Sequence, residues 1–558
     1  MELPILILIV CSIGFVLVGG CTTITSPPPA VTPAMEPPIT PTIQVTPFVE
    51  STLPVSYTDT LCGELVYCGY APAGFETQPV TSSRCDQLYA LRMNNDQKVL
   101  QCLKNQPEPG GNNSGERSQC MQGIGTAEDC ARYGILIDRD SGSGAIGKDE
   151  TGSDSSIRQT KDDGYIVIGS INEVSSGYST EDIRVVKLNP AGDIQWQKVL
   201  GGDGFDSGRS IEPTTDGGYI LTGLTDSDNT GDVGPNHGGS DVWVVKLNPA
   251  GDIQWQKVLG GEGFDSGRSI DQATDGGYIL TGLTDSDNTG DVGPNHGGSD
   301  VWVVKLNPAG IIQWQKVLGG EGFDSGRSIE HTPGGEFILT GVTDSDNTGD
   351  VGPNHGGSDV WVVKLNPAGI IQWQKVLGGY GFESGRDIVQ ATDGGYILTG
   401  PTDSDNTGDV GPNHGESDIW AVKLNPAGDI QWQKVLGGEG FESGRGTDQA
   451  TDGGYILTGP TDSDNTGDVG PNHGGSDVWV VKLNPAGIIQ WQKVLGGYGF
   501  ESGRSIEHTT GGGFILTGLT DSDNTGDVGP NQGGSAIWVV KLNPGGDIQW
   551  QKVLGGAA

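Results

Sequence analysis

The chain has 558 residues, and its 71 acidic against 31 basic side chains give a formal net charge of −40 at pH 7. So acidic a chain is repelled by nucleic acid and by anionic lipid surfaces, and we expect neither as a partner. All eight cysteines precede residue 131.

Residues 3–20 form an apolar run without a charged side chain, and the run ends at Val18-Gly19-Gly20-Cys21. Small residues directly before a cysteine are typical of a lipoprotein, so we predict a signal peptide over residues 1–21 and a lipid anchor at Cys21. Two features depart from the bacterial pattern, because Val18 stands where leucine is usual and the first residues contain no lysine or arginine. An uncleaved helix of about 18 residues would also span a bilayer. Both interpretations place the rest of the chain outside the cytoplasm, anchored to the cell membrane.

Residues 22–56 are rich in proline and threonine and have few large apolar side chains, which predicts an extended stalk. Residues 57–135 contain six cysteines, which in an exported chain favour a small domain with three disulfides. Within this domain, residues 86–106 have the apolar pattern of a helix. Zinc binding is the rival interpretation, but the chain has no Cys-x-x-Cys pair and no histidine before His237. The candidate disulfide cysteines are Cys62, Cys68, Cys85, Cys102, Cys120 and Cys130.

The rest of the chain is a tandem repeat. The tetrapeptide Ile-Gln-Trp-Gln recurs at a constant step of 59 residues, with its tryptophan at Trp196, Trp255, Trp314, Trp373, Trp432, Trp491 and Trp550. Each copy holds four segments of strand composition, which in the second copy are residues 267–273, 277–283, 300–307 and 312–318. Four strands per repeat indicate a propeller blade, and the repeat is longer than solenoid repeats usually are. We therefore predict an all-β fold, a seven-bladed β-propeller over residues 136–558, preceded by the small disulfide-rich, partly helical domain.

The two ends of the repeat array suggest how the ring closes. The last copy stops at Gly556 without the Gly-Arg-Ser-Ile segment that follows other copies. At the front, Ile157 precedes Tyr165 by the same eight residues by which Ile211 precedes Tyr219. We predict that this N-terminal strand completes the last blade, which would leave no exposed strand edge at the seam.

Three segments recur around the array: Asp-Gly-Gly-Tyr-Ile-Leu-Thr-Gly, then Gly-Gly-Ser-Asp-Val-Trp-Val-Val-Lys-Leu-Asn-Pro-Ala-Gly, then Lys-Val-Leu-Gly-Gly. Together they resemble the β-propeller repeats that are common in large bacterial and archaeal cell-surface proteins, and the resemblance covers all seven copies. It implies a propeller fold and display outside the cell. It brings no catalytic residues that can be carried over.

A long loop between the second and third strands carries many of the acidic side chains. Residues 284–291 read Thr-Asp-Ser-Asp-Asn-Thr-Gly-Asp, and close copies recur in every blade except the first, whose loop is shorter. Alternating oxygen ligands and a turn glycine resemble the start of a calcium loop, although a threonine replaces the third ligand and the closing glutamate is missing. The alternative is that these side chains cap their own turns. No cofactor is required on this interpretation, and calcium is the candidate ion. Its candidate ligands are Asp226, Asp228, Asp232, Asp285, Asp287, Asp291, Asp344, Asp346, Asp350, Asp403, Asp405, Asp409, Asp462, Asp464, Asp468, Asp521, Asp523 and Asp527.

A histidine recurs at one position of this loop, and the last copy has Gln532 there instead. One histidine per blade makes a poor metal cluster, so hydrogen bonding within the turn is the favoured role. The histidines are His237, His296, His355, His414 and His473.

An arginine recurs at the head of the presumed innermost strand, three residues after an aspartate or glutamate. These arginines are expected to rim the central channel. They form either a repeated ion pair between strand and loop or an anion site at the axis. They are Arg209, Arg268, Arg327, Arg386, Arg445 and Arg504.

Near-identical blades do not supply the unlike residues that a catalytic site brings together, so we predict that the chain is not an enzyme. Repeated loops form a multivalent surface instead, which favours a monomeric binding or scaffold module for a cell-envelope polymer, a glycan or a surface protein. A propeller enzyme is one alternative, because Gly251 to Trp255 is similar to the Gly-x-x-x-Trp docking turn of quinoprotein dehydrogenases, without their Ala-x-Asp lead. That similarity transfers only the docking of blade against blade. A passive surface spacer is the other alternative.

Overall fold

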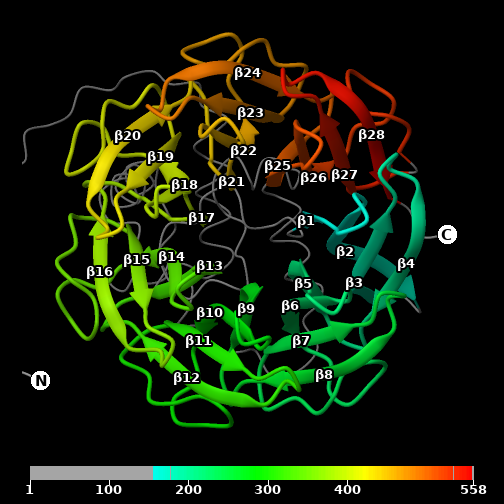
Figure 1. Cartoon of the computed structure of the whole chain (residues 1–558), viewed down its shortest axis with the longest axis vertical. Helices are drawn as coiled ribbons and strands as arrows, with labels where there is room; N and C mark the ends of the chain where they lie inside the picture. The colour runs from blue at the N-terminus through cyan, green and yellow to red at the C-terminus, as the bar shows by residue number, and fades with distance from the viewer. Residues whose placement is uncertain (1–154, 176–177, 532, 556–558) are drawn as a thin grey trace, which may run out of the picture. The chain divides into compact units, whose positions relative to one another are not determined.

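The computed structural model describes residues 155–175, 178–531 and 533–555. In these ranges the chain forms 28 β-strands, which pair into seven antiparallel four-stranded sheets around a central axis (Figure 1). The predicted all-β seven-bladed propeller is thereby confirmed. No helix with the length and apolar character of a membrane span occurs among the described residues.

The features predicted ahead of the propeller lie outside the described residues. They are the signal peptide with its lipid anchor Cys21, the stalk over residues 22–56, and the domain over residues 57–135 with its helix and six cysteines. The predicted start of the propeller at residue 136 falls there too. All of these stay predictions.

Each blade is one continuous stretch of chain, and its strands follow one another from the axis outwards. Blade 1 has β1 (Ser156–Gln159), β2 (Tyr165–Ser175), β3 (Tyr178–Leu188) and β4 (Ile194–Leu200). Blade 2 has β5 (Asp206–Pro213), β6 (Tyr219–Thr225), β7 (Asp241–Leu247) and β8 (Ile253–Leu259). Blade 3 has β9 (Asp265–Gln272), β10 (Tyr278–Thr284), β11 (Asp300–Leu306) and β12 (Ile312–Leu318). Blade 4 has β13 (Asp324–His331), β14 (Phe337–Thr343), β15 (Asp359–Leu365) and β16 (Ile371–Leu377). Blade 5 has β17 (Asp387–Gln390), β18 (Tyr396–Thr402), β19 (Asp418–Leu424) and β20 (Ile430–Leu436). Blade 6 has β21 (Gly446–Gln449), β22 (Tyr455–Thr461), β23 (Asp477–Leu483) and β24 (Ile489–Leu495). Blade 7 has β25 (Glu501–His508), β26 (Phe514–Thr520), β27 (Ala536–Leu542) and β28 (Ile548–Leu554).

The two middle strands of a blade are buried because neighbouring blades pack on both of their faces. In blade 3, β10 reads Tyr-Ile-Leu-Thr-Gly-Leu-Thr and β11 reads Asp-Val-Trp-Val-Val-Lys-Leu, and every residue of both strands is buried. The outermost strand β12 places glutamine and lysine between its apolar residues and is only partly buried. The strand ranges predicted for this copy agree with β9 to β12 to within two residues at each end.

Each blade docks on the next through the tryptophan of its outermost strand. The ring centroid of Trp314 in β12 lies 6.0 Å from that of Phe337 in blade 4, and its Nε1 donates to the carbonyl of Pro367 at 3.1 Å. Equivalent pairs of tryptophan with tyrosine or phenylalanine lie 5.7–6.0 Å apart at the other junctions. The predicted packing of this tryptophan between blades is confirmed.

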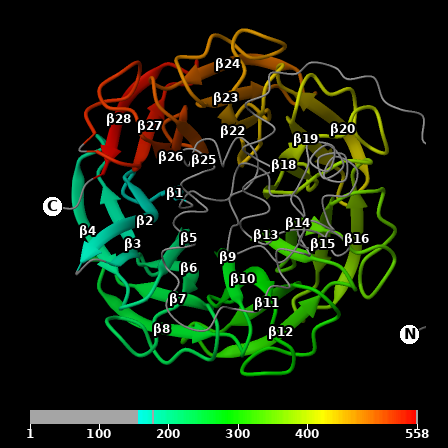
Figure 2. The ribbon, with the colours of Figure 1, turned by 180° about the vertical axis from the view of Figure 1, so that it is seen from behind.

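The ring closes by the same docking, and the prediction that the N-terminal strand completes the last blade is wrong. β1 pairs with β2, and blade 7 has four strands of its own. The reason is the tight turn in which the Thr160 amide donates to the Gly164 carbonyl at 2.9 Å, because this turn makes β1 and β2 a hairpin. Trp550 of β28 packs on Tyr165 and on Gly192, where a Cβ would lie only 2.9 Å from the indole. Both views show β1 beside β25 at this seam (Figures 1 and 2).

The long loops and the connections between blades emerge on one face of the ring, which we call the loop face. In blade 3 the Asp291 amide donates to the Gly260 carbonyl at 2.8 Å, and the Gly298 amide donates to the Gly322 carbonyl at 3.2 Å. The long loops of blades 2 to 6 are thus hydrogen-bonded to the connections on both sides of their blades, and that of blade 7 to the connection before it, where the Asp527 amide donates to the Gly496 carbonyl at 2.8 Å. The six long loops are residues 226–240, 285–299, 344–358, 403–417, 462–476 and 521–535.

Blade 1 has a different structure at this place. Its strands β2 and β3 are 11 residues long and stay paired as far as Ser175 and Tyr178, so a β-hairpin replaces the long loop. The sequence predicted only a shorter loop in this blade, and most of residues 170–182 are strand. The acidic motif is absent from blade 1, as its sequence requires.

A buried lysine joins the two hairpin turns on the opposite face. In blade 3, Lys305 Nζ lies 2.9 Å from the Asp275 carboxylate and 3.1 Å from the Leu306 carbonyl. Blades 4 and 7 have a glycine at the position of that aspartate. In blade 4, Lys364 Nζ lies 2.7 Å from the Glu336 carboxylate, and in blade 7, Lys541 donates to Thr509 Oγ1 at 2.6 Å. Burial lowers the pKa of Lys541 to about 8.

Candidate functional site

The recurring arginine lies at a β-bulge on the innermost strand. In blade 2, Gly208 pairs with Gly223 and Ser210 pairs with the preceding Thr222, so Arg209 is an extra residue without a partner in the register. A bulge redirects a side chain out of the ladder and is frequent beside binding sites. Gly223 is required here because a Cβ would collide with the backbone of the bulged strand.

The same register shift recurs at Arg268, Arg327 and Arg504. In blades 5 and 6 the innermost strand begins one residue after the arginine, and the amides of Arg386 and Arg445 donate to the next strand at 2.9 Å. Each of the six arginines has at least one further polar or electrostatic interaction within the chain.

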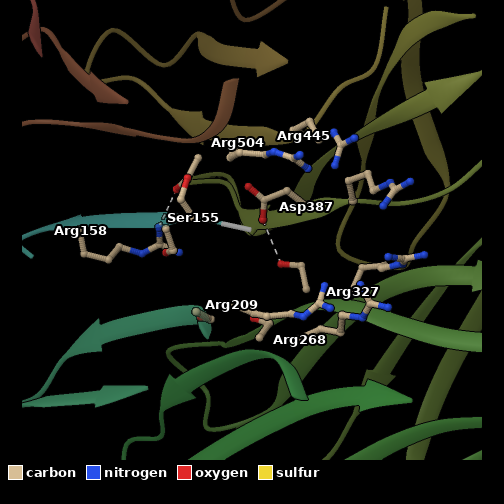
Figure 3. Close-up of a pocket in the computed structure, with 14 residues that line it drawn as sticks. Ser155, Arg158, Arg209, Arg268, Arg327, Asp387, Arg445 and Arg504 are labelled. Atoms are coloured by element: carbon tan, nitrogen blue, oxygen red, sulfur yellow. Dashed lines mark hydrogen bonds between the residues drawn. The ribbon is translucent and has the colours of Figure 1, made fainter. Parts of the chain in front are cut away.

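The arginines converge on a pocket of about 130 Å³ at the axis (Figure 3). All six arginines predicted to rim the channel line it, so the structure brings this set together. The lining consists of arginines and serines with a single carboxylate: Ser155, Ser156, Arg158, Arg209, Ser210, Arg268, Ser269, Arg327, Ser328, Arg386, Asp387, Arg445, Arg504 and Ser505. All seven blades contribute to it.

Blade 1 supplies its arginine from a different position. Ser155 replaces the bulge arginine, and Arg158 reaches the pocket from three residues further along β1. Arg158 Nε lies 2.5 Å from Glu212 Oε1, and its Nη1 donates to Ser505 Oγ at 3.2 Å. Burial alone would lower the pKa of Arg158, but the carboxylates of Glu212 and Glu507 raise it, so this guanidinium stays charged.

Carboxylates follow the arginines along the same strands and link neighbouring blades. Asp271 accepts the His331 amide at 2.8 Å, and Glu330 accepts the Gln390 amide at 2.8 Å. Asp448 and Glu507 accept amides of the next blade in the same way. We call these residues, together with Glu212, the acid belt. The belt was not predicted from the sequence, where its only signal is an acidic residue three positions after the arginine in most copies.

Burial dominates the titration of the acid belt. It raises the pKa of Glu507 to about 7, although Arg158 and the Gln159 amide oppose the shift. It also holds the pKa of Glu330 well above its usual value, with the charge of Asp271 adding to the effect. Two belt carboxylates pair with histidines, and the hydrogen bond that Asp271 accepts from the His331 ring raises the pKa of His331.

The loop histidines make the turn hydrogen bonds that the sequence favoured. His296 donates its backbone amide to Asp300 Oδ2 at 2.6 Å, and its Nδ1 lies 3.0 Å from the same oxygen. The arrangement recurs at His237, His355, His414 and His473. Each ring is therefore committed to an aspartate of its own blade.

Asp300 is a buried carboxylate that was not predicted as a site residue from the sequence. It begins β11, is completely buried, and lies near the equally buried Asp324 of the next blade. Burial raises the pKa of Asp300, and the Asp324 carboxylate raises it further. The recurring Ser-Asp before Val-Trp was its only sequence signal.

The candidate calcium ligands lie on the loop face, and several of them cap their own turns. Asp285 accepts the Ser299 hydroxyl, and Asp287 accepts the Asn295 amide at 3.1 Å. The backbone amide of Asp291, the third candidate in this loop, donates to the Gly260 carbonyl in the connection from the preceding blade. Within the described ranges no three acidic, histidine or cysteine side chains are placed to hold one metal ion. Calcium binding by these loops stays a prediction.

Comparisons with known proteins find only distant similarities. No protein-family model matches the chain. An uncharacterized WD repeat-containing protein of Acanthamoeba polyphaga mimivirus is 23% identical to this chain over 37% of the chain's length. The matched segment spans only 19% of that relative's length. A mutant of the Synechocystis apocarotenoid oxygenase is similar with a TM-score of 0.40 at 13% identity, covering 73% of this chain and 94% of its own. A protein of unknown function from Dyadobacter fermentans has a TM-score of 0.34 at 9% identity, with 60% and 92% covered. Similarities this distant carry no conclusion about activity.

Proposed function

We propose that this chain is a cell-surface binding module that engages a repeating partner through its loop face and catalyses no reaction. The observation that carries the proposal is the recurrence of one hydrogen-bonded pair of loops at successive blades of the same face. A ligand with repeating units can occupy several copies at once, and linked binding events raise the overall affinity by orders of magnitude.

The loops are held in shape before any partner arrives. The Glu262 amide donates to Thr289 Oγ1 at 2.9 Å, and the Gly263 amide donates to Ser286 Oγ at 2.9 Å. Inside the loop, the Asn288 amide donates to the Gly293 carbonyl at 3.0 Å. Binding to such a surface costs little ordering of the backbone, which favours affinity.

Exposed aromatic rings on this face support a polymer or glycan as the partner. Tyr380 and Tyr498, in the connections that follow blades 4 and 6, are 76% and 78% exposed. Tyrosine offers a flat apolar ring and a hydroxyl at low entropic cost, which suits contact with sugar rings and with protein surfaces. The proposed partners are a cell-envelope polymer, a glycan or a surface protein, and the proposed location is outside the cell, on the N-terminal membrane anchor.

Similar blades also support a role without catalysis. Catalysis requires a nucleophile, a base and a group that stabilises developing charge at one place. The long loops of blades 2 to 7 repeat nearly one set of residues. A monomer is sufficient for the proposed role, because one ring already presents several copies of the surface.

Binding of the purified full-length chain to a glycan array and to isolated envelope fractions tests the proposal, in calcium and in EDTA. We expect the double variant Tyr380→Ala/Tyr498→Ala to bind at least about tenfold more weakly. The matched control is Ile311→Ala/Ile370→Ala, which removes two side chains, each 59% exposed, from hairpin turns on the opposite face. An equal loss in both double variants, or no binding by the native chain in either condition, contradicts the proposal.

A further inference from the structure

The histidines of the long loops use only one ring nitrogen within their own blade. In blade 4, His355 Nδ1 lies 2.9 Å from Asp359 Oδ2. An ionised carboxylate accepts hydrogen bonds and donates none, so in the neutral ring Nδ1 carries the hydrogen. Nε2 then keeps its electron pair for a ligand, and the histidine side chain is 33% exposed.

Nε2 of His355 faces a carboxylate that belongs to the next blade. Asp409, the third aspartate of the long loop of blade 5, places its Oδ2 at 3.9 Å from this nitrogen and is itself 34% exposed. The backbone of Asp409 is held by its own amide, which donates at 2.8 Å to the Gly378 carbonyl in the connection between the two blades. The pair therefore spans the junction of blades 4 and 5 on the loop face, where an ion from solvent reaches both side chains.

The spacing of this nitrogen and oxygen suits two ligands of one metal ion. Two atoms that bind a zinc ion in tetrahedral geometry, each at about 2.1 Å, lie about 3.4 Å apart. A shift of about half an ångström, shared between two partly exposed side chains, brings the pair to that spacing. An imidazole nitrogen favours zinc, copper and nickel, whereas calcium and magnesium prefer oxygen ligands.

The buried aspartate behind the ring is the partner that metal-binding histidines usually have. Such a histidine donates its other N–H to a carboxylate, which orients the ring and strengthens it as a ligand. Asp359 holds this position, and its second oxygen, Oδ1, is buried without a hydrogen-bond partner among the described residues. Burial raises the pKa of Asp359, and the charge of Asp409 raises it further. A cation between His355 and Asp409 offsets this repulsion.

The histidine is present wherever the next blade supplies this aspartate, and only there. Blade 7 docks on blade 1, which has no acidic loop, and in blade 7 Gln532 replaces the histidine and Ala536 replaces the aspartate behind it. A hydrogen bond within one turn does not depend on the neighbouring blade, whereas a site shared by two blades does. The five pairs, each 54 residues apart, are His237 with Asp291, His296 with Asp350, His355 with Asp409, His414 with Asp468, and His473 with Asp527.

We propose that His355 Nε2 and the Asp409 carboxylate together bind one divalent transition-metal ion of the zinc class, and that the four equivalent pairs repeat this site around the loop face. Two protein side chains leave the other positions of the ion to water or to a donor from a partner. The affinity is therefore below that of a closed structural zinc site, which has four protein ligands. The proposal does not depend on the binding of a polymer or glycan.

Protection of the histidines from diethyl pyrocarbonate tests each junction separately. The reagent modifies accessible imidazole nitrogens, and mass spectrometry of tryptic peptides measures the modification of each histidine. The thiols of the purified full-length chain are alkylated first, so that no cysteine binds the metal. With zinc chloride at about ten times the Kd, the modification of His355 should slow about tenfold. Calcium chloride should not protect it, and neither metal should protect His331 or His508, which pair with the acid belt.

The variant Asp409→Asn tests whether the site is shared between two blades. It keeps the size of the side chain and removes the charged ligand, so the zinc affinity measured at His355 should fall at least about tenfold. Protection of His296, whose partner is Asp350, should stay unchanged in the same molecule. The matched control Asp429→Asn removes the same charge from an exposed hairpin turn on the opposite face of blade 5 and should leave both histidines protected.

Zinc that fails to protect His355 in a saturable manner overturns the proposal, and so does equal protection of His331 and His508. Asp409→Asn overturns it by leaving the protection of His355 intact or by weakening His355 and His296 equally. Calorimetry with zinc chloride is the second measurement, and it is decisive if His355 is not modified in the metal-free chain. It compares the native chain with the variant in which all five loop histidines are glutamine, and equal heats overturn the proposal. Failure of glycan or envelope binding leaves these results unaffected.

Discussion

The indole of Trp550, on the last strand of the propeller, meets the ring of Tyr165 in the first blade at a centroid distance of 5.8 Å. The seam therefore uses the contact found inside the array, where Trp314 lies 6.0 Å from Phe337. No strand is shared between the first blade and the last. We expect Trp550→Ala to lower the free energy of unfolding by about 2–4 kcal/mol, because the indole is only partly buried.

Urea denaturation followed by tryptophan fluorescence measures this loss, and Trp314→Ala is the matched control within the array. Equal losses mean that the seam is as strong as any other junction. A loss at Trp550 below half of that at Trp314 would contradict closure by docking.

The buried lysine of blade 7 offers a stabilising substitution. Gly511 stands where blades 1, 2, 3, 5 and 6 have the aspartate that pairs with the equivalent lysine, and a Cβ there meets no atom within 4 Å. Gly511→Asp should raise the free energy of unfolding at pH 7 by about 1–2 kcal/mol, because it supplies a carboxylate for Lys541. Thermal and urea denaturation measure the gain, and Gly545→Asp adds the same charge elsewhere in blade 7 as the control.

The pH dependence of this gain has a definite sign. Burial lowers the pKa of Lys541 to about 8 in the folded chain, against about 10.5 in the unfolded chain. The unfolded chain therefore binds more protons in this window, so native stability rises with pH between these values. The advantage of Gly511→Asp should shrink over the same range, and an advantage that grows with pH would refute the assignment.

The acid belt predicts the opposite trend at lower pH. Burial raises the pKa of Glu507 to about 7, from the ordinary value of 4.5. Since the folded chain binds the proton more tightly, this group's contribution to stability is complete below pH 4.5 and is lost as the pH rises through 7. We expect the melting temperature to fall between pH 5 and pH 8, and to fall less in Glu507→Gln.

The amide of Glu507→Gln still accepts the hydrogen bond that Gln159 donates to the native carboxylate. The exposed Glu262→Gln is the control, and its profile should match that of the native chain. Identical slopes in Glu507→Gln and the native chain would show that Glu507 does not titrate in this range.

The buried aspartates at the blade junctions combine a needed acceptor with an unfavourable charge. Asp300 accepts two hydrogen bonds from His296, while burial raises the pKa of its carboxyl. Asp300→Ala should lower the free energy of unfolding by about 2–3 kcal/mol because it leaves buried donors without an acceptor. Asp300→Asn keeps an acceptor oxygen and removes the charge, so its effect should stay within about 1 kcal/mol. Denaturation curves at pH 7 separate the two effects, and equal losses would show that the charge itself is needed.

Much of the fold could be predicted because the strands and turns of each blade follow from the sequence of a single repeat. The spacing of Trp314 and its equivalents gave the number of blades, and apolar runs such as that of β11 gave the buried strands. The seam was mispredicted because an identical strand can belong to the blade before or after it. The hairpin between β1 and β2 decides that this strand belongs to the first blade. The spacing of Ile157 and Tyr165 already matched the spacing in the corresponding hairpin of the other blades.

The candidate site was only half predictable for a different physical reason. The position of Arg209 at the head of the innermost strand placed it near the axis. The bulge that directs it there is a relation between two strands, a shift of register against Gly223, and no single segment of sequence contains it. The acid belt is likewise a set of contacts between blades, as between Glu330 and Gln390, and becomes visible only once the ring is closed.

The continuity of each blade in the chain has a consequence for how such a protein can change in length. Recombination between two near-identical repeats inserts or deletes whole blades, and every hydrogen-bonded sheet in the product is still complete. Only the angle between neighbouring blades must adjust, since the tryptophan contact at the seam is the one used everywhere else. A gene for this ring can therefore gain or lose blades in single steps without passing through a product that has a broken sheet.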